Sequence, residues 1–256
     1  MLEKHLLFDK LKILGIRTAL IVYWSKTGNT EKVAYAIKEG LEALEVQVSV
    51  KRVEEAGGED FFSYDLVCVG SPSYSWHPPE PMVNFLKEKF AVYRNAGKVK
   101  LCAPKVPGKY ALIFVTYSGP HTGVDEAIPA GKYMRQFFEH LGFTVLDEWY
   151  VLSEFHGSLE NSTKGRMGDI RGKPTREDLL KITEDTKRLV KEHLLQSNIA
   201  LFSVLGSKLI VYHMCLSSLE SFNYRFENFL LWCLVWVKLK SMLSILLSLG
   251  QKILLM

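Results

Sequence analysis

From residue 18 onward, short unbroken apolar runs alternate with stretches whose apolar residues are spaced as on one face of a helix. The first run, Thr18 to Tyr23, lacks polar alternation, which is typical of a strand buried on both faces. Similar runs follow at residues 65–70 and 110–116. Strands of this kind occur in parallel sheets that carry helices on both faces, so the pattern predicts an α/β fold.

The whole pattern predicts a doubly wound sheet of five parallel strands. The strands are expected at residues 18–23, 46–50, 65–70, 110–116 and 143–152. The helices are expected at residues 30–44 and 80–91, from about Pro129 to Leu141, and onward from a cap at Thr175. The crossover connections are expected to be right-handed, and the expected strand order is 2-1-3-4-5, one of the common orders of doubly wound sheets.

Two long connections separate these elements. Residues 92–109 are basic and rich in turn formers, whereas residues 153–174 are rich in glycine and serine. Both are expected to be loops. Within the fifth strand, Asp147 and Glu148 are candidates for a break in the pairing.

The loop after the first strand is suited to a phosphate group. Backbone N–H groups at the start of the next helix would point toward an anion bound there. Gly28 lets the backbone approach the anion closely, and the hydroxyls of Ser25, Thr27 and Thr30 can donate hydrogen bonds to it. The alternative is a polar turn that only caps the helix. The complete loop reads Ser25-Lys26-Thr27-Gly28-Asn29-Thr30.

Several other classes of site are excluded by the sequence. Gly28 is followed by Asn29 rather than by a lysine, so the loop is not a Walker A motif, and it is not a GxGxxG dinucleotide loop. Residues 17–196 contain 24 Lys/Arg and 24 Asp/Glu residues, which gives no basic patch for nucleic acid. The four cysteines form no CxxC pair, so no metal site is expected, and the usage suits a reducing cytoplasm.

The phosphate loop closely resembles the (S/T)-x-T-G-x-T loop of the flavodoxin family, whose cofactor is flavin mononucleotide (FMN). Two further segments resemble the family's flavin-ring loops, and the resemblance spans about 180 of the 256 residues. One segment follows the third strand and the other follows the fourth. They read Gly70-Ser71-Pro72-Ser73-Tyr74-Ser75-Trp76 and Thr116-Tyr117-Ser118-Gly119-Pro120-His121-Thr122-Gly123.

The resemblance implies that these two segments hold the flavin ring. The ring is flat and apolar with a polar edge, so its pocket needs aromatic faces and nearby hydrogen-bonding groups. Tyr74, Trp76 and Tyr117 are the candidate faces, although each could instead serve ordinary packing or the surface. The remaining candidate contacts are Ser71, Pro72, Ser73, Thr116, Ser118 and Gly119.

The resemblance leaves three functions open. The first is an FMN-binding carrier that moves electrons between redox partner proteins and needs no catalytic side chain. The second is an NAD(P)H-dependent FMN or quinone oxidoreductase, which the neutral domain and the long 153–174 loop favour. In that case Arg166 or Arg171 could meet a nicotinamide phosphate or an anionic partner, unless the loop is merely solvated. The third is an interaction module without flavin.

The two ends of the chain lie outside the flavodoxin pattern. Residues 1–16 are expected to be an N-terminal extension that forms a short amphipathic helix, and residues 17–196 the FMN-binding domain. Residues 197–256 form an extra hydrophobic segment in which 37 of 60 residues are apolar and none is proline.

Two stretches of this hydrophobic segment, residues 199–219 and 229–249, are long enough to be membrane spans. Lys208, Lys238 and Lys240 interrupt them, and a lysine at the bilayer centre costs about 2.5 to 3.5 kcal/mol. The segment is therefore a membrane anchor, a helical interaction or dimerisation segment, or a tail without function. We expect a cytoplasmic protein with membrane association through this segment as one alternative.

Overall fold

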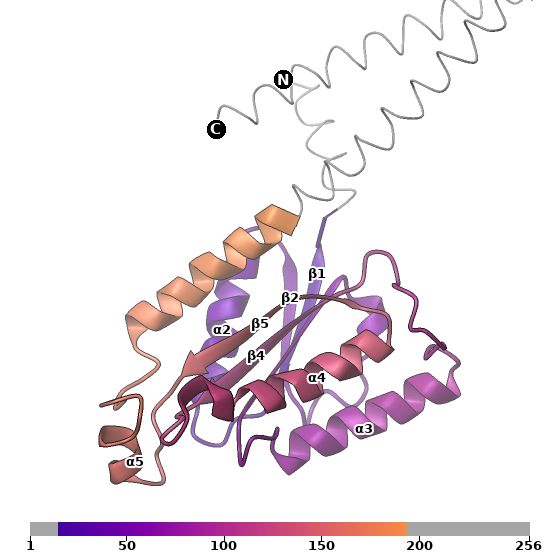
Figure 1. Ribbon diagram of the computed structural model, residues 1–256. Helices are drawn as coiled ribbons and strands as arrows, with labels where there is room; N and C mark the ends of the chain where they lie inside the picture. Colours follow the sequence, from indigo (N-terminus) through magenta and orange to yellow (C-terminus); the bar gives the residue numbers. More distant parts are fainter. Residues whose placement is uncertain (1–14, 194–256) are drawn as a thin grey trace, which may run out of the picture. The chain divides into compact units, whose positions relative to one another are not determined.

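The computed structural model of the chain describes residues 15–193. Its strands form one parallel five-stranded sheet in the order β2-β1-β3-β4-β5, with helices on both faces (Figure 1). The strands are β1 (Thr18–Tyr23), β2 (Gln47–Arg52), β3 (Leu66–Pro72), β4 (Tyr110–Tyr117) and β5 (Thr144–Leu152). The doubly wound α/β fold and the strand order predicted from the sequence are confirmed.

The helices follow the predicted alternation with longer or shifted ends. Residues 176–193 form the last described helix, which is coloured orange in Figure 1. Two 3₁₀ turns, η2 (Phe61–Ser63) and η3 (Gly123–Glu126), lie in connections. The α-helices are α2 (Asn29–Glu42), α3 (Glu80–Asn95), α4 (Ile128–His140) and α5 (Leu159–Thr163).

The sheet is buried on both faces, which explains its unbroken apolar runs. In β1, Leu20 and Val22 belong to one core, whereas Ala19 and Ile21 belong to the other. The second core lies against α2 and residues 176–193, and it also includes Ile16, just before β1. Because neither face meets water, the period-2 polar alternation of a half-exposed strand is absent.

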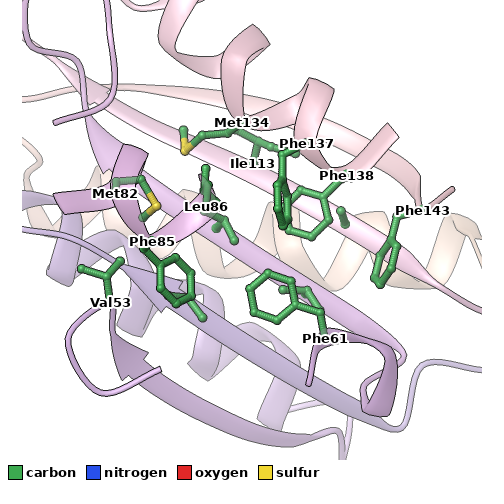
Figure 2. Close-up of a cluster of buried hydrophobic side chains, with 14 of the residues drawn as sticks. Val53, Phe61, Met82, Phe85, Leu86, Ile113, Met134, Phe137, Phe138 and Phe143 are labelled. Atoms are coloured by element: carbon green, nitrogen blue, oxygen red, sulfur yellow. The ribbon is translucent and has the colours of Figure 1, made fainter. Parts of the chain in front are cut away.

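The first core is dominated by aromatic rings from α3, α4 and η2. Figure 2 shows Phe61 facing the side chains of both helices. Its ring stacks on Phe138 at 5.9 Å between centroids and contacts Phe85 and Phe137 at similar distances. The η2 turn thereby fixes the connection between β2 and β3 to the two helices on this face of the sheet.

One prediction about the second half of the domain needs correction. The 153–174 connection is not wholly a loop, because it contains α5, whose N-terminus is capped by the Ser158 side chain accepting from Asn161 N–H at 3.2 Å. The irregular pairing expected in the fifth strand takes the form of a bulge directly before Asp147, since Ala111 pairs with Val145 and Leu112 with Asp147, and the strand itself continues.

The last described helix begins with the predicted cap. Thr175 Oγ1 accepts a hydrogen bond from Asp178 N–H at 3.2 Å, and the Asp178 carboxylate accepts one from Thr175 N–H at 2.8 Å. These reciprocal bonds are those of a capping box, with aspartate in the place of the usual glutamate. Within this helix Ile182 and Val190 are buried and Leu179 and Leu189 pack beside them.

We expect Thr175→Ala to lower the free energy of unfolding by about 1 kcal/mol, because it removes the acceptor for an N–H group of the first turn. Thr175→Ser keeps this acceptor and should unfold at nearly the same denaturant concentration as the wild type. Urea titration of the three proteins measures both effects. Equal loss in the alanine and serine variants would show that the hydroxyl does not stabilise the helix.

The ends of the chain fall outside the described residues. This applies to residues 1–14 of the predicted N-terminal helix, whereas Gly15 and Ile16 are described and are not helical. It also applies to every alternative for residues 197–256. Within residues 15–193, no helix combines the length and apolar character needed to cross a membrane.

Candidate functional site

The carboxyl ends of β1, β3 and β4 bring three loops together. The N–H of Trp24 donates to Gly70 O at 3.0 Å, and the N–H of Ser73 donates to Thr116 O at 2.9 Å. The rings of Trp24 and Tyr74 meet edge to face with centroids 5.9 Å apart. The phosphate-loop and ring-loop candidates therefore lie at one edge of the sheet, where the strand order reverses and ligands bind in folds of this type.

The N-terminus of α2 is open to an anion. Gly28 is the N-cap residue with φ of 93°, a left-handed conformation that favours glycine, and no described side chain caps the helix. A Cβ built on Gly28 would meet nothing within 4 Å, so the space in front of the turn is free. The first-turn N–H groups have no acceptor within their own helix, and together with the helix dipole they favour a phosphate.

The side chains of the phosphate loop divide into exposed and buried groups. Lys26 and Thr27 are exposed and lie free in front of the helix. Ser25 is buried and its Oγ accepts from Gly28 N–H at 3.1 Å, while its carbonyl accepts from the Arg52 guanidinium at 2.6 Å. These two bonds hold the loop in its turn.

Thr30 does not point into open space. Its side chain is only 1% exposed, and its hydroxyl lies 2.7 Å from the Thr116 hydroxyl on β4. The pair ties the start of α2 to the end of β4. Both residues were predicted to contact the cofactor, and in this structure each hydroxyl already has a partner.

Asn29 carries the observation that best tests the fit of a cofactor. Its side-chain N–H₂ donates to Glu154 O at 3.1 Å, whereas its Oδ1 is buried without any hydrogen-bond partner among the described residues. A buried acceptor without a donor is costly, so such an atom marks a place where a ligand donor belongs. A hydroxyl of a bound phosphorylated flavin chain would supply that donor, and the loop therefore fits FMN.

The first ring loop is a tight turn that presents two aromatic side chains. Tyr74 and His77 exchange backbone hydrogen bonds of 2.8 and 3.0 Å, and Ser75 and Trp76 between them have φ of 48° and 68°. The Trp76 side chain is 61% exposed and that of Tyr74 is 42% exposed. Exposed aromatic faces on a rigid turn are suited to a flat apolar ring.

The serines of this loop have structural partners instead. Ser71 is fully buried, with its Oγ 3.8 Å from Met134 Sδ, and Ser73 Oγ donates to Glu126 O at 2.6 Å. Pro72 is partly buried between them. The side chains of Ser71 and Ser73 are therefore directed to α4 and to the residues just before it.

The second ring loop is rigid as well. The N–H groups of His121 and Thr122 both donate to the Glu126 carboxylate at 2.7 Å. Gly119 has φ of 55°, and a Cβ built on it would lie 2.5 Å from Gly123 O, so only glycine fits there. Ser118 and Tyr117 are partly buried at the start of the loop, and burial raises the pKa of the Tyr117 hydroxyl.

The 153–174 connection joins two of these loops, which the sequence alone did not indicate. Glu154 O accepts from Asn29, and Arg166 N–H donates to Pro120 O at 2.8 Å. The two arginines considered from the sequence differ. Arg171 is held by Asp169 at 2.6 Å, and its hydrogen bonds lower the pKa of Asp169 to about 2. Arg166 is exposed beside the second ring loop and forms no ion pair with the described residues.

The comparisons agree with this geometry. The family model described as Flavodoxin matches residues 21–186. A flavodoxin of Aquifex aeolicus is 44% identical over 137 residues, which cover 53% of this chain and 68% of the relative. An NAD(P)H dehydrogenase (quinone) of Sinorhizobium fredii is 49% identical over 129 residues, covering 43% of this chain and 61% of that protein.

Among solved structures, oxidised Flavodoxin 2 of Bacillus cereus is similar with a TM-score of 0.49 and 18% identity, over 69% of this chain and 99% of that one. The family match extends from β1 into the last described helix, and so includes all three loops. The chain therefore belongs to the flavodoxin family of FMN-binding electron-transfer proteins.

Proposed function

We propose that this protein carries electrons between redox partner proteins in the cytoplasm. The observation that carries the proposal is the exposed turn at Tyr74 to His77, which would leave an edge of a bound ring open to another protein. Bound FMN supplies the redox chemistry, and electron exchange at an exposed edge needs no catalytic side chain. The residues of this chain bind and orient the cofactor.

The binding roles follow from the contacts described above. The amides at the start of α2 and the Thr27 hydroxyl would hold the phosphate, and Asn29 Oδ1 would accept from a cofactor hydroxyl. Tyr74 and Trp76 would cover the ring on one side. Gly119 would let the second ring loop approach it on the other. Ser25, Thr30 and Thr116 support these groups from behind.

Stepwise reduction of the purified protein tests the proposed electron-carrier function directly. We expect a flavin absorption spectrum that bleaches stepwise when reductant is added, with electrons passing on to an acceptor protein such as cytochrome c. Without a separate reductase, NAD(P)H should leave the spectrum unchanged. Rapid reduction by NAD(P)H alone would instead support the second candidate.

That second candidate is an NAD(P)H-dependent FMN or quinone oxidoreductase. One observation favours it. Arg166 is exposed beside the second ring loop, and a Cβ built on Gly123 would lie 3.7 Å from Arg166 Cδ. An unpaired arginine is suited to a nucleotide phosphate. Steady-state turnover of a quinone that is lost in Arg166→Ala and kept in Arg171→Ala would establish this function.

The two threonines of the phosphate loop should respond differently to substitution. Thr27→Ala removes an exposed hydroxyl, so we expect about tenfold weaker FMN binding without loss of stability. Thr30→Ala leaves the buried Thr116 hydroxyl without its partner and should also lower the free energy of unfolding by about 1 to 3 kcal/mol. Thr30→Ser is the control that keeps the pair. Fluorescence titration and urea unfolding separate the effects, and normal binding by both alanine variants would contradict the assignment.

A further inference from the structure

A basic loop lies at the opposite edge of the sheet from the FMN loops. Residues 96–109 connect α3 to the amino end of β4 and contain four lysines and no acidic residue. Lys98 is paired with Asp60 at 3.2 Å. Lys105 and Lys109 donate to the neutral carbonyl oxygens of Phe143 and Tyr64, and Lys100 is exposed. The last three form no ion pair within residues 15–193, so their positive charge is uncompensated there.

The base of the loop is fixed while its tip projects. Val106 N–H donates to Gly142 O at 2.8 Å, which together with the Lys105 bond fastens the loop to the turn before β5. At the tip, Ala103 N–H donates to Lys100 O at 3.1 Å and closes a turn. That turn holds Leu101, which is 96% exposed, beside the exposed Cys102. A leucine held out in water on a fixed basic loop has no role in the packing of the domain.

The last residue that the structure describes lies at this same edge of the sheet. The last described residue, His193, lies against Tyr110 at the start of β4, with ring centroids 4.2 Å apart. The segment that follows is strongly apolar, with 37 of the last 60 residues apolar and a formal charge of +3. The exposed apolar tip, the lysines without ion pairs and the last described residue of the chain thus lie at one edge of the sheet.

We propose that the loop of residues 96–109 docks on an anionic lipid surface. Leu101 enters the interface between headgroups and acyl chains, and Lys100, Lys105 and Lys109 lie near the lipid phosphates. This arrangement turns the carboxyl ends of the strands, and with them the FMN loops, away from the lipid and toward partners in water.

Cys102 is a native probe for this contact. In the full chain with Cys215→Ser and Cys233→Ser, Cys102 is the reactive thiol, because Cys68 is buried and burial raises its pKa. Each basic residue at an anionic surface strengthens binding by roughly fivefold. Vesicles of phosphatidylcholine and phosphatidylserine should therefore slow the reaction of Cys102 with a water-soluble maleimide by at least about tenfold.

Two control variants make the result specific. In the same background, Cys102→Ser with Leu159→Cys moves the probe to α5, which follows the carboxyl end of β5 and has another exposed leucine. Its labelling should be unaffected by vesicles. Lys100→Glu should restore most of the labelling rate at Cys102, as should high salt.

Three outcomes would overturn the proposal. The first is an unchanged Cys102 rate on anionic vesicles, which would mean that the loop of residues 96–109 does not contact the lipid. The second is equal slowing on pure phosphatidylcholine or at residue 159, which would indicate burial without charge recognition. The third is slow labelling without vesicles, which would make the tip a protein interface.

Discussion

Riboflavin is expected to bind this protein at least about a thousandfold more weakly than FMN. The two ligands share the ring and the sugar chain and differ only in the phosphate. The α2 N-terminus offers first-turn amides without a side-chain cap, and Thr27 is exposed in front of them. Three charge-assisted hydrogen bonds at about 1.5 kcal/mol each amount to about 4.5 kcal/mol, or three orders of magnitude.

The effect is expected to be large because no described side chain accepts a hydrogen bond from the first-turn N–H groups of α2. In a helix capped by a side chain, an aspartate or serine would already occupy the amides, and a phosphate would have to displace it. Here Gly28 takes the cap position and Ser25 Oγ is engaged by the Gly28 N–H. The amides of the next residues are left to water until an anion arrives.

Quenching of flavin fluorescence on binding measures both dissociation constants. Inorganic phosphate should compete with FMN at high concentration, because it occupies the same amides. Comparable affinities for riboflavin and FMN would contradict the phosphate-loop assignment.

The buried framework was predictable from the sequence because local pattern and tertiary packing agree there. The run from Thr18 to Tyr23 is a strand with both faces covered, and its limits match those predicted. The Thr175 and Asp178 spacing identified a helix start because capping depends on residues three apart. In these places the sequence pattern and the final contacts involve the same few residues.

The parts that were missed depend on contacts between distant residues. The bond from Asn29 to Glu154 joins positions 125 residues apart, and the pair of Thr30 and Thr116 joins positions 86 apart. No local pattern signals either contact. The glycine-rich composition of residues 153–174 indicated a loop, yet the Ser158 cap starts a helix within it. Composition gives average propensity, whereas one cap decides where a short helix begins.

The sequence did not distinguish candidate residues that can contact a ligand from those that only support the loops. Most residues of the three loops were candidate contacts, whether their side chains were exposed or not. The structure separates Thr27, Tyr74 and Trp76, which are exposed, from Ser71 and Thr30, which are buried. The buried residues position the loops, and the exposed ones are free to touch a ligand. Separating the two groups requires the solvent exposure of each side chain, and the sequence motif carries no such information.

Deletion of residues 197–256 should leave the fold and FMN binding intact while changing where the protein is found. Helices cover both faces of the sheet within residues 15–193 (Figure 1). Val190 of the last described helix is buried in the second core. The three FMN loops end before residue 128. The deleted segment is therefore not needed to close the core or to build the site, and we propose residue 196 as the domain boundary.

The same deletion removes 37 apolar residues, and unburied apolar surface on that scale drives association with membranes or other chains. We expect the full chain in the membrane or pellet fraction and the shortened chain in the supernatant, with equal FMN content per folded protein. Thermal melting should differ by only a few degrees. Loss of FMN, or a melting temperature lower by more than about 10 °C, would place the segment in the folded core. On the docking proposal, the shortened chain keeps a weak, salt-sensitive affinity for anionic vesicles through Leu101 and Lys100, since the loop of residues 96–109 remains.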